Sequence, residues 1–123
     1  MGRLDAELLE RVEAFCHRCL DVVEQIENQG RSRRILDQLT GCSTSIGANL
    51  YEADEALSRK DFAKCVAISI KELNETRFWI RPIVGRGWIQ PGRLDNLADE
   101  AEQLKRIMGA ILSRTRSAST NRA

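Results

Sequence analysis

Residues 8–26 read LLERVEAFCHRCLDVVEQI, and the apolar positions in this stretch recur at alternating steps of four and three. Residues with this spacing share one face of an α-helix, because the helix repeats every 3.6 residues or so, about 100° per residue. The apolar positions on that face are Leu8, Val12, Phe15, Cys19, Val22 and Ile26. The stretch therefore predicts an amphipathic helix, over about 4–28, that packs against a core.

Three further stretches keep the same spacing. The second stripe consists of Ile35, Leu39, Cys42, Ile46, Asn49, Ala53 and Ala56. The third consists of Phe62, Val66, Ser69, Leu73, Thr76, Ile80 and Ile83. The fourth consists of Leu94, Leu97, Ala101, Leu104, Met108 and Ile111. Four such stripes joined by short connections predict an all-α fold, an antiparallel up-down four-helix bundle.

Turn and capping residues place the boundaries of the helices. Gly30 predicts the end of the first helix, and the second is expected over 32–57, where Gly41 and Gly47 permit close helix packing. Ser58 and Asp61 form a capping box that starts a third helix, which continues to about residue 84. Glycine and proline then mark a loop, and the fourth helix is expected over 93–113. We expect one domain, 1–113, followed by a flexible tail over 114–123.

Composition fits one compact domain. The chain has 123 residues, of which 42% are hydrophobic, and its 19 basic and 18 acidic residues give a net charge of +1. No apolar run approaches the roughly 20 residues that span a bilayer, and residues 1–10 do not resemble a signal peptide. We therefore expect a cytoplasmic protein without a membrane partner.

The four cysteines are Cys16, Cys19, Cys42 and Cys65, and all lie within predicted helices at or beside the stripes. A reduced cysteine in this position behaves as a small apolar residue, so we interpret them as core thiols. The alternative is a zinc site built on Cys16, Cys19 and the intervening His17. On a helix, His17 points away from the face that the two cysteines share, and the sequence has no second pair of potential zinc ligands with a similar spacing. We expect neither a metal nor a cofactor.

Polar residues interrupt the second and third stripes. Because the connection between these two helices is short, Asn49 and Ser69 lie equally far from it and are expected to meet and form a hydrogen bond, directly or through a water. Ser45 and Glu52 share the face of Asn49. Lys71 and Glu75 are one turn apart on the third helix and can pair with each other. These six residues predict a structural polar network, with a ligand site as the alternative.

A family resemblance emerges from the middle of the chain. The segment Ser45-Ile46-Gly47-Ala48-Asn49-Leu50-Tyr51-Glu52-Ala53, then Ser58-x-x-Asp61-Phe62, then Lys71-Glu72-x-x-Glu75-Thr76-x-x-Trp79, resembles the 23S rRNA intervening sequence protein family. The resemblance implies a small bacterial four-helix bundle that is not an enzyme. It also implies similarity to the accessory protein of diversity-generating retroelements and a ring-forming homo-oligomer, a pentamer. A partner implied in the same way is structured RNA or a nucleic-acid enzyme such as a reverse transcriptase.

Arginines are the candidate residues for contact with nucleic acid. Unlike the strongly basic retroelement proteins, this chain is nearly neutral, so a basic surface has to be local. One group lies at the start of the second helix and the other around the end of the third, and antiparallel packing brings both groups to one end of the bundle. The candidates are Arg31, Arg33, Arg34, Arg77, Arg81, Arg86 and Arg93. The alternative is that these arginines are solvated or pair with Glu27, Asp37 and Asp95.

Phe78, Trp79 and Trp88 belong to the same region of the chain. Phe78 lies off the third stripe, so we expect it to be partly exposed, and packing between subunits is the favoured role for these aromatic residues. Stacking on bases is the alternative role.

Catalytic motifs are missing from the sequence. The single histidine excludes the two Glu-x-x-His motifs of a di-iron bundle, and no phosphate-binding loop or nucleophile elbow is present. Two functions remain. One is a homo-oligomeric adaptor that binds nucleic acid or a nucleic-acid enzyme, and the other is a protein-interaction scaffold with no nucleic-acid role.

Overall fold

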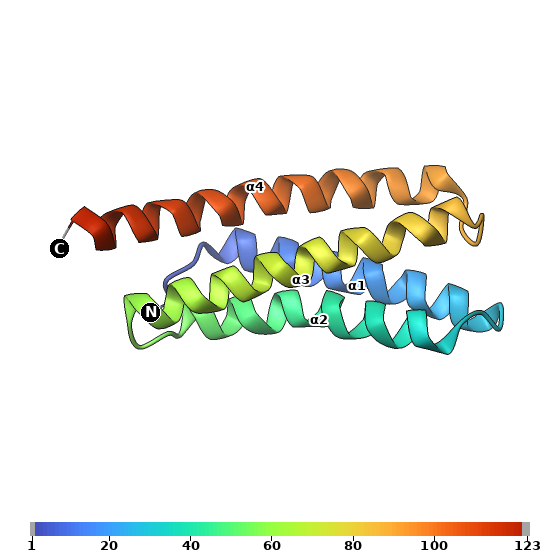
Figure 1. The fold of residues 1–123 in the computed structure, drawn as a ribbon, viewed down its shortest axis with the longest axis horizontal. Helices are drawn as coiled ribbons and strands as arrows, with labels where there is room; N and C mark the ends of the chain where they lie inside the picture. The colour runs from blue at the N-terminus through green and yellow to red at the C-terminus, as the bar shows by residue number, and fades with distance from the viewer. Residues whose placement is uncertain (1, 122–123) are drawn as a thin grey trace.

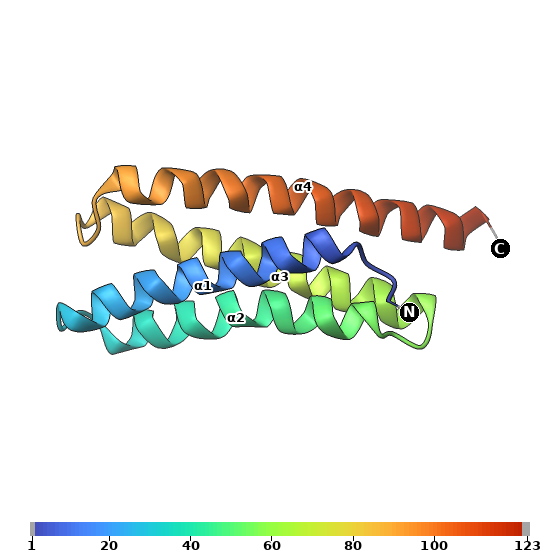
Figure 2. The same cartoon turned by 180° about the vertical axis from the view of Figure 1, so that it is seen from behind.

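A computed structural model describes residues 2–121 of the chain as four helices (Figure 1). Helix α1 spans Ala6–Asn28, α2 spans Arg33–Asp54, α3 spans Arg59–Gly85 and α4 spans Pro91–Asn121. Helices that follow each other in the chain run antiparallel and pack side by side, as Figure 2 shows from the other side. The predicted all-α four-helix bundle is confirmed.

The predicted cap at Ser58 starts α3, and a cap that was not predicted, at Asp5, starts α1. The Ser58 hydroxyl accepts a hydrogen bond from the backbone N–H of Asp61 at 3.0 Å, and Asp5 caps α1 in the same way through the N–H of Glu7. Such caps satisfy N–H groups that have no partner within the helix. Gly30 has a φ of 69°, a left-handed conformation that glycine adopts without strain, and it lies just after α1 as predicted.

The core contains the predicted stripes. Every predicted position of α1 and α3 is buried, including the polar Ser69 and Thr76. In α2 the buried stripe differs from the prediction at three positions. Leu36 and Leu50 are buried where Ile35 and Asn49 were expected, and Ala56 lies after the end of α2 and is only partly buried. The reason is that α2 packs against both α1 and α3, and a helix with two neighbours buries a wider face.

The two glycines of α2 play different roles. A Cβ atom at Gly47 would lie 3.4 Å from the Cys16 Sγ on α1, so this glycine lies where the two helices approach closely. A Cβ at Gly41 would meet nothing within 4 Å, and Gly41 is exposed. The expectation of close packing is therefore confirmed at Gly47 and wrong at Gly41.

Helix α4 is longer than predicted. It continues to Asn121, so its end was placed too early at Ser113 and most of the expected tail over 114–123 is helical. Residues 122–123 lie outside the described part. Thr115 and Ala118 line a cavity beside α3 and the N-terminal segment, which gives this extension a surface to pack on. None of the helices within residues 2–121 combines the length and the apolar character needed to cross a membrane.

Candidate nucleic-acid interface

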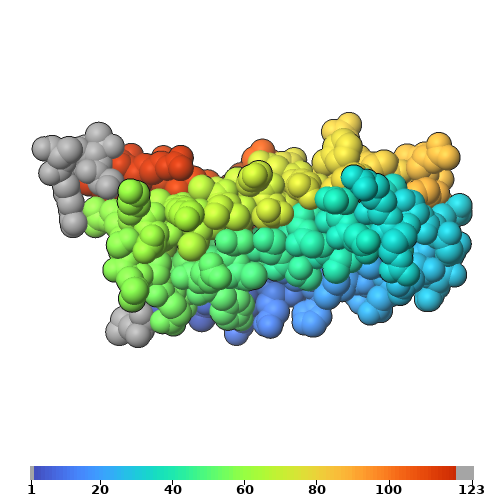
Figure 3. All heavy atoms as spheres, turned by 60° about the horizontal axis from the view of Figure 1, so that its bottom comes forward, coloured from blue at the N-terminus to red at the C-terminus, as the bar shows by residue number. Residues whose placement is uncertain are grey.

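The two connections that carry the candidate arginines lie together at one end of the bundle, which we call the arginine-rich end. The Gln29 side chain, after α1, donates from its Nε2 to the carbonyl oxygen of Trp88 in the α3–α4 loop at 2.9 Å. The guanidinium carbon of Arg31 lies 5.3 Å from the centroid of the Trp88 ring, within the range of a cation–π contact. Figure 3 shows atoms of both connections sharing this end of the surface. The structure thus brings the two predicted groups of arginines together.

Two of the seven candidate arginines have acidic partners. Arg33 pairs with Glu27 at 3.4 Å, one of the pairs foreseen as the alternative, and both side chains are more than half exposed. Arg77 pairs with Glu102 of α4 at 2.8 Å. Within residues 2–121 no ion pair involves Arg31, Arg34, Arg81, Arg86 or Arg93, nor the expected partners Asp37 and Asp95. The arginine-rich end therefore keeps an excess of positive charge that faces solvent.

An apolar groove borders the arginine-rich end, between α3 and α4. It encloses about 420 Å³ and is lined by Arg77, Phe78 and Arg81 of α3 and Ala98 of α4, among others. The Phe78 side chain is 57% exposed, as expected from its place off the stripe. An exposed ring flanked by two arginines is suited to a contact with another macromolecule, because such a surface is apolar at its centre and charged at its edge.

Trp79 follows Phe78 on α3 and contacts it. Its ring packs edge-to-face on Phe78, with centroids 5.2 Å apart and planes at 73°. The Trp79 indole Nε1 is buried and has no hydrogen-bond partner among the described residues. A buried donor without a partner costs about 1–3 kcal/mol, so this indole N–H is a local weak point of the α3 packing.

The predicted polar network is not formed as expected. The Ser69 hydroxyl donates to the carbonyl oxygen of Ile46 at 2.8 Å, whereas the Asn49 amide donates to the carbonyl oxygen and hydroxyl of Ser45 in its own helix. The expected bond between Asn49 and Ser69 is therefore wrong, because Ser69 lies opposite Ile46, about one turn away along α2.

The other members of that network lie apart from each other. Glu52, Lys71 and Glu75 are exposed, and no ion pair joins Lys71 to Glu75 within residues 2–121. Instead, the second buried polar contact between α2 and α3 is the hydroxyl of Thr76, which donates to the Sγ of Cys42 at 3.2 Å. Single hydrogen bonds, not a network, thus join α2 to α3.

The cysteines are core thiols, as predicted. Cys19 and Cys42 are buried, and Cys16 and Cys65 are partly buried. Burial away from water raises the pKa of Cys19 and raises that of Cys42 to about 11, because the thiolate loses its hydration. The Cys16 thiol donates to the carbonyl oxygen of Ser43 at 2.9 Å, and His17 is exposed. Within residues 2–121 no cluster of three potential metal ligands occurs.

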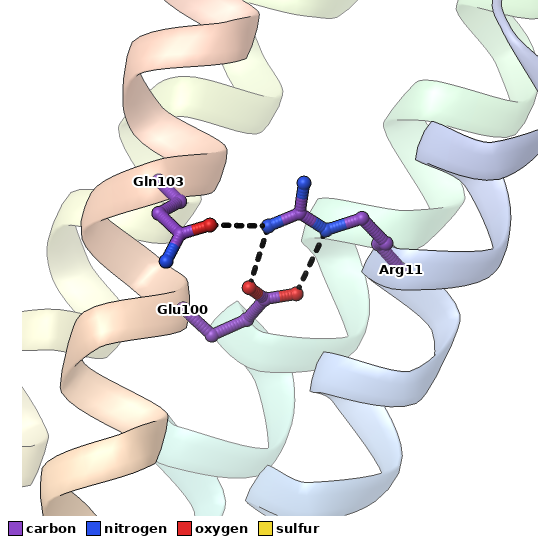
Figure 4. A network of polar contacts seen from close by, with 3 residues as sticks. All are labelled: Arg11, Glu100 and Gln103. Carbon is purple, nitrogen blue, oxygen red and sulfur yellow. Dashed lines mark hydrogen bonds and ion pairs between the residues drawn. The ribbon is translucent and has the colours of Figure 1, made fainter.

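Long-range contacts of α4 were missed from the sequence. Arg11 on α1 binds both carboxylate oxygens of Glu100, and its Nη2 also donates to the Gln103 side chain at 3.0 Å (Figure 4). At the far end of the bundle, Arg3, Arg59 and Arg114 line one cavity. Thr115 and Ala118 continue the four–three spacing after Ile111, and this was the available signal that α4 extends to that cavity.

Comparisons with known proteins agree with this architecture. No curated protein matches the chain. A solved structure of a protein of unknown function, from the S23 ribosomal protein family of Bacteroides thetaiotaomicron, is similar to it with a TM-score of 0.81 and 25% identity. That match covers 85% of this chain and 97% of the other. The sequence model of a family described as 23S rRNA-intervening sequence protein matches residues 5–110. The chain therefore belongs to the 23S rRNA-intervening sequence protein family.

Proposed function

We propose that this protein is a non-enzymatic adaptor, a homo-oligomer that binds RNA, DNA or a nucleic-acid enzyme through its arginine-rich end. The observation that carries the proposal is the set of exposed arginines at one end of a nearly neutral chain, five of which form no ion pair within residues 2–121. A ring repeats that end around its symmetry axis and so multiplies the charge. The ring then presents a continuous positive surface to the phosphate groups of a nucleic acid.

The family resemblance supports the assembly part of the proposal and favours five subunits. Phe78 is the natural contact residue, since its exposed ring lies in a groove with Ala98. Association that covers this groove removes apolar surface from water.

The test of nucleic-acid binding compares two charge-reversal variants. Arg34→Glu with Arg86→Glu changes both connections at the arginine-rich end, at exposed positions that lack ion pairs. The control variant, Lys71→Glu with Lys105→Glu, changes the net charge by the same amount at positions away from that end. Affinity for a structured RNA is measured by fluorescence anisotropy at several salt concentrations.

We expect the first variant to lose at least tenfold in affinity and to reduce the salt dependence by about one counterion per arginine. The control variant is expected to bind as the unmodified protein does. Equal loss in both variants indicates nonspecific charge effects, and absence of salt-dependent binding in the unmodified protein contradicts the nucleic-acid part of the proposal.

The test of assembly is the mass in solution by light scattering. We expect a salt-resistant multimer that Phe78→Glu converts toward a monomer of 13.9 kDa without loss of helical circular dichroism. A monomer for the unmodified protein contradicts the ring.

The second candidate function is a protein-interaction scaffold without a nucleic-acid role. Exposure of the Phe78 ring in an apolar groove favours it, because the same surface suits a different protein as well as a second copy. A multimer that binds no RNA at low salt supports the scaffold over the adaptor.

A further inference from the structure

A cavity of about 480 Å³ lies at the opposite end of the bundle from the arginine-rich end. Three segments that are distant in the sequence form its wall, namely the N-terminal segment, the start of α3 and the last turns of α4. Each segment contributes one arginine: Arg3, Arg59 and Arg114. We call this space the three-arginine cavity.

Positive charge exceeds negative charge on this wall. No carboxylate forms an ion pair with Arg3, Arg59 or Arg114 within residues 2–121. Asp5 is the one acidic residue on the wall, and one of its carboxylate oxygens already accepts the N–H of Glu7 as the cap of α1. Three guanidinium groups and one carboxylate give the wall a net charge of +2, which a phosphate monoester dianion neutralises.

Hydrogen bonds within the protein hold Arg3 in place at the cavity. The N-terminal segment is bonded to the end of α2, since the backbone N–H of Leu4 donates to the Asp54 carboxylate at 2.7 Å and that of Arg3 donates to the Asp54 carbonyl at 3.1 Å. The Arg3 Nε also donates to the carbonyl oxygen of Ala56 at 2.8 Å, which leaves its terminal nitrogens for a ligand. Arg59 is the first residue of α3, where the helix dipole adds positive potential.

The remaining wall is apolar. Leu4, Phe62 and Ile111 face the same cavity, and Phe62 is almost fully buried. Guanidinium groups match the oxygen geometry of phosphate, and an adjoining apolar surface favours a phosphate with an organic substituent over the bare ion.

A second hollow continues from the first along α3 and α4. It is lined by Arg59, Lys60 and Lys64 of α3 together with Thr115 and Arg116 of α4, so it shares Arg59 and Thr115 with the three-arginine cavity. A ligand that carries more than one phosphate group therefore meets further positive side chains beyond the first site.

We propose that the three-arginine cavity binds the phosphate group of a phosphate ester, supplied by a free nucleotide or by the backbone of a nucleic acid. The site is separate from the arginine-rich end, and it stands on the cavity and its three guanidinium groups rather than on the proposed adaptor function.

The test measures binding of inorganic phosphate, AMP and a short single-stranded RNA by calorimetry at low salt. The variant Arg59→Gln with Arg114→Gln removes two charges from the cavity, and Arg34→Gln with Arg86→Gln is the matched control at the other end. We expect Arg59→Gln with Arg114→Gln to bind AMP at least tenfold more weakly and the control to keep the affinity of the cavity for AMP. Because the arginine-rich end is also proposed to bind RNA, RNA is tested in the background of Arg34→Gln with Arg86→Gln, where adding Arg59→Gln and Arg114→Gln is expected to weaken the remaining binding at least tenfold. Binding of AMP identifies a nucleotide site, and RNA binding that depends on Arg59 and Arg114 without binding of AMP identifies a backbone site.

Amide NMR spectra give a readout that does not depend on a variant. We expect AMP or RNA to shift the resonances of Leu4, Phe62 and Thr115 on the cavity wall. The proposal is overturned if neither ligand binds or shifts these resonances, or if Arg59→Gln with Arg114→Gln retains full affinity. RNA binding that depends only on Arg34 and Arg86, with no binding of AMP, also overturns it, and that result leaves the adaptor function intact.

Discussion

Arg11 and Glu100 form a bidentate ion pair between α1 and α4, with nitrogen–oxygen distances of 2.6 and 3.1 Å. Helix α4 packs mainly on α3 and contacts α1 less, so this pair is a principal polar link across the open side of the bundle. Glu100 raises the pKa of the Arg11 guanidinium through its hydrogen bond and its charge. That pKa already lies far above neutrality, so the Arg11 guanidinium stays charged throughout the physiological pH range.

Removal of this pair is expected to destabilise the fold modestly. Glu100→Ala lowers the free energy of unfolding by about 1 kcal/mol, the upper range for a pair near the surface, because the geometry is bidentate and the side chains are only 29% and 21% exposed. Urea unfolding of Arg11→Ala, Glu100→Ala and the double variant measures the coupling. The same cycle for Arg33 and Glu27, 73% and 53% exposed, serves as the control and is expected to give a coupling near zero. Equal couplings in the two cycles contradict the prediction.

Alanine substitution is expected to lower the unfolding free energy by different amounts at Ser69, which bonds across the α2–α3 interface, and at Asn49, which bonds within its own helix. Ser69→Ala removes a fully buried bond to the Ile46 carbonyl and is expected to lower the unfolding free energy by about 1 kcal/mol. Asn49→Ala is expected to cost less than about 0.5 kcal/mol, because its amide bonds only within α2 and alanine has the higher helix propensity. Thermal and urea unfolding compare the two, and a larger cost at Asn49 contradicts this assignment.

The sequence predicted the buried stripe fully in α1 and α3 and less well in α2. In α1 and α3 the structure buries every predicted position, although α1 also has the neighbouring apolar residues Leu9, Cys16 and Val23, which are partly buried. In α2, the neighbours Ile35 and Leu36, and again Asn49 and Leu50, offer two stripes one residue apart. Local periodicity does not choose between them, and the choice depends on packing against both α1 and α3.

The candidate site, too, could be predicted only in part from the sequence. Topology alone brought the two groups of arginines to one end, because α2 begins where α3 finishes. The pairing of Arg77 with Glu102 depends on the axial register between α3 and α4, which a single sequence does not specify. The three-arginine cavity was missed because it requires α4 to extend past Ser113, into a segment with few apolar residues.

The third prediction is that alanine substitution of two glycines changes the unfolding free energy in opposite directions. Gly41→Ala is expected to raise the unfolding free energy by roughly 0.5–1 kcal/mol, because the site is exposed within α2 and a Cβ meets nothing within 4 Å. Gly30→Ala is expected to lower it by about 1 kcal/mol, since a φ of 69° is unfavourable for alanine. Urea midpoints at constant slope measure both changes, and stabilisation at Gly30 contradicts the backbone argument.

The buried thiols make stability depend on alkaline pH. Burial raises the pKa of Cys42 to about 11 from an ordinary value of 9.0, so the folded protein retains a proton that the unfolded chain releases. This contribution is fully present below pH 9 and is lost as the pH rises through 11, by at most about 3 kcal/mol for Cys42, since the two pKa units correspond to about 1.4 kcal/mol each. Cys19, whose pKa is also raised by burial, acts in the same direction.

The variant Cys42→Ala isolates the effect of the Cys42 thiol from other effects of alkaline pH on stability. Its unfolding free energy is expected to be lower than that of the unmodified protein at pH 8, because a buried side chain is truncated. The gap between the two proteins is expected to narrow as the pH rises from 9 to 11, since alanine has no proton to lose. Urea unfolding at several pH values measures the gap. A gap that stays constant means that the Cys42 thiol ionises as readily in the folded state as in the unfolded chain, so that burial does not hold its proton.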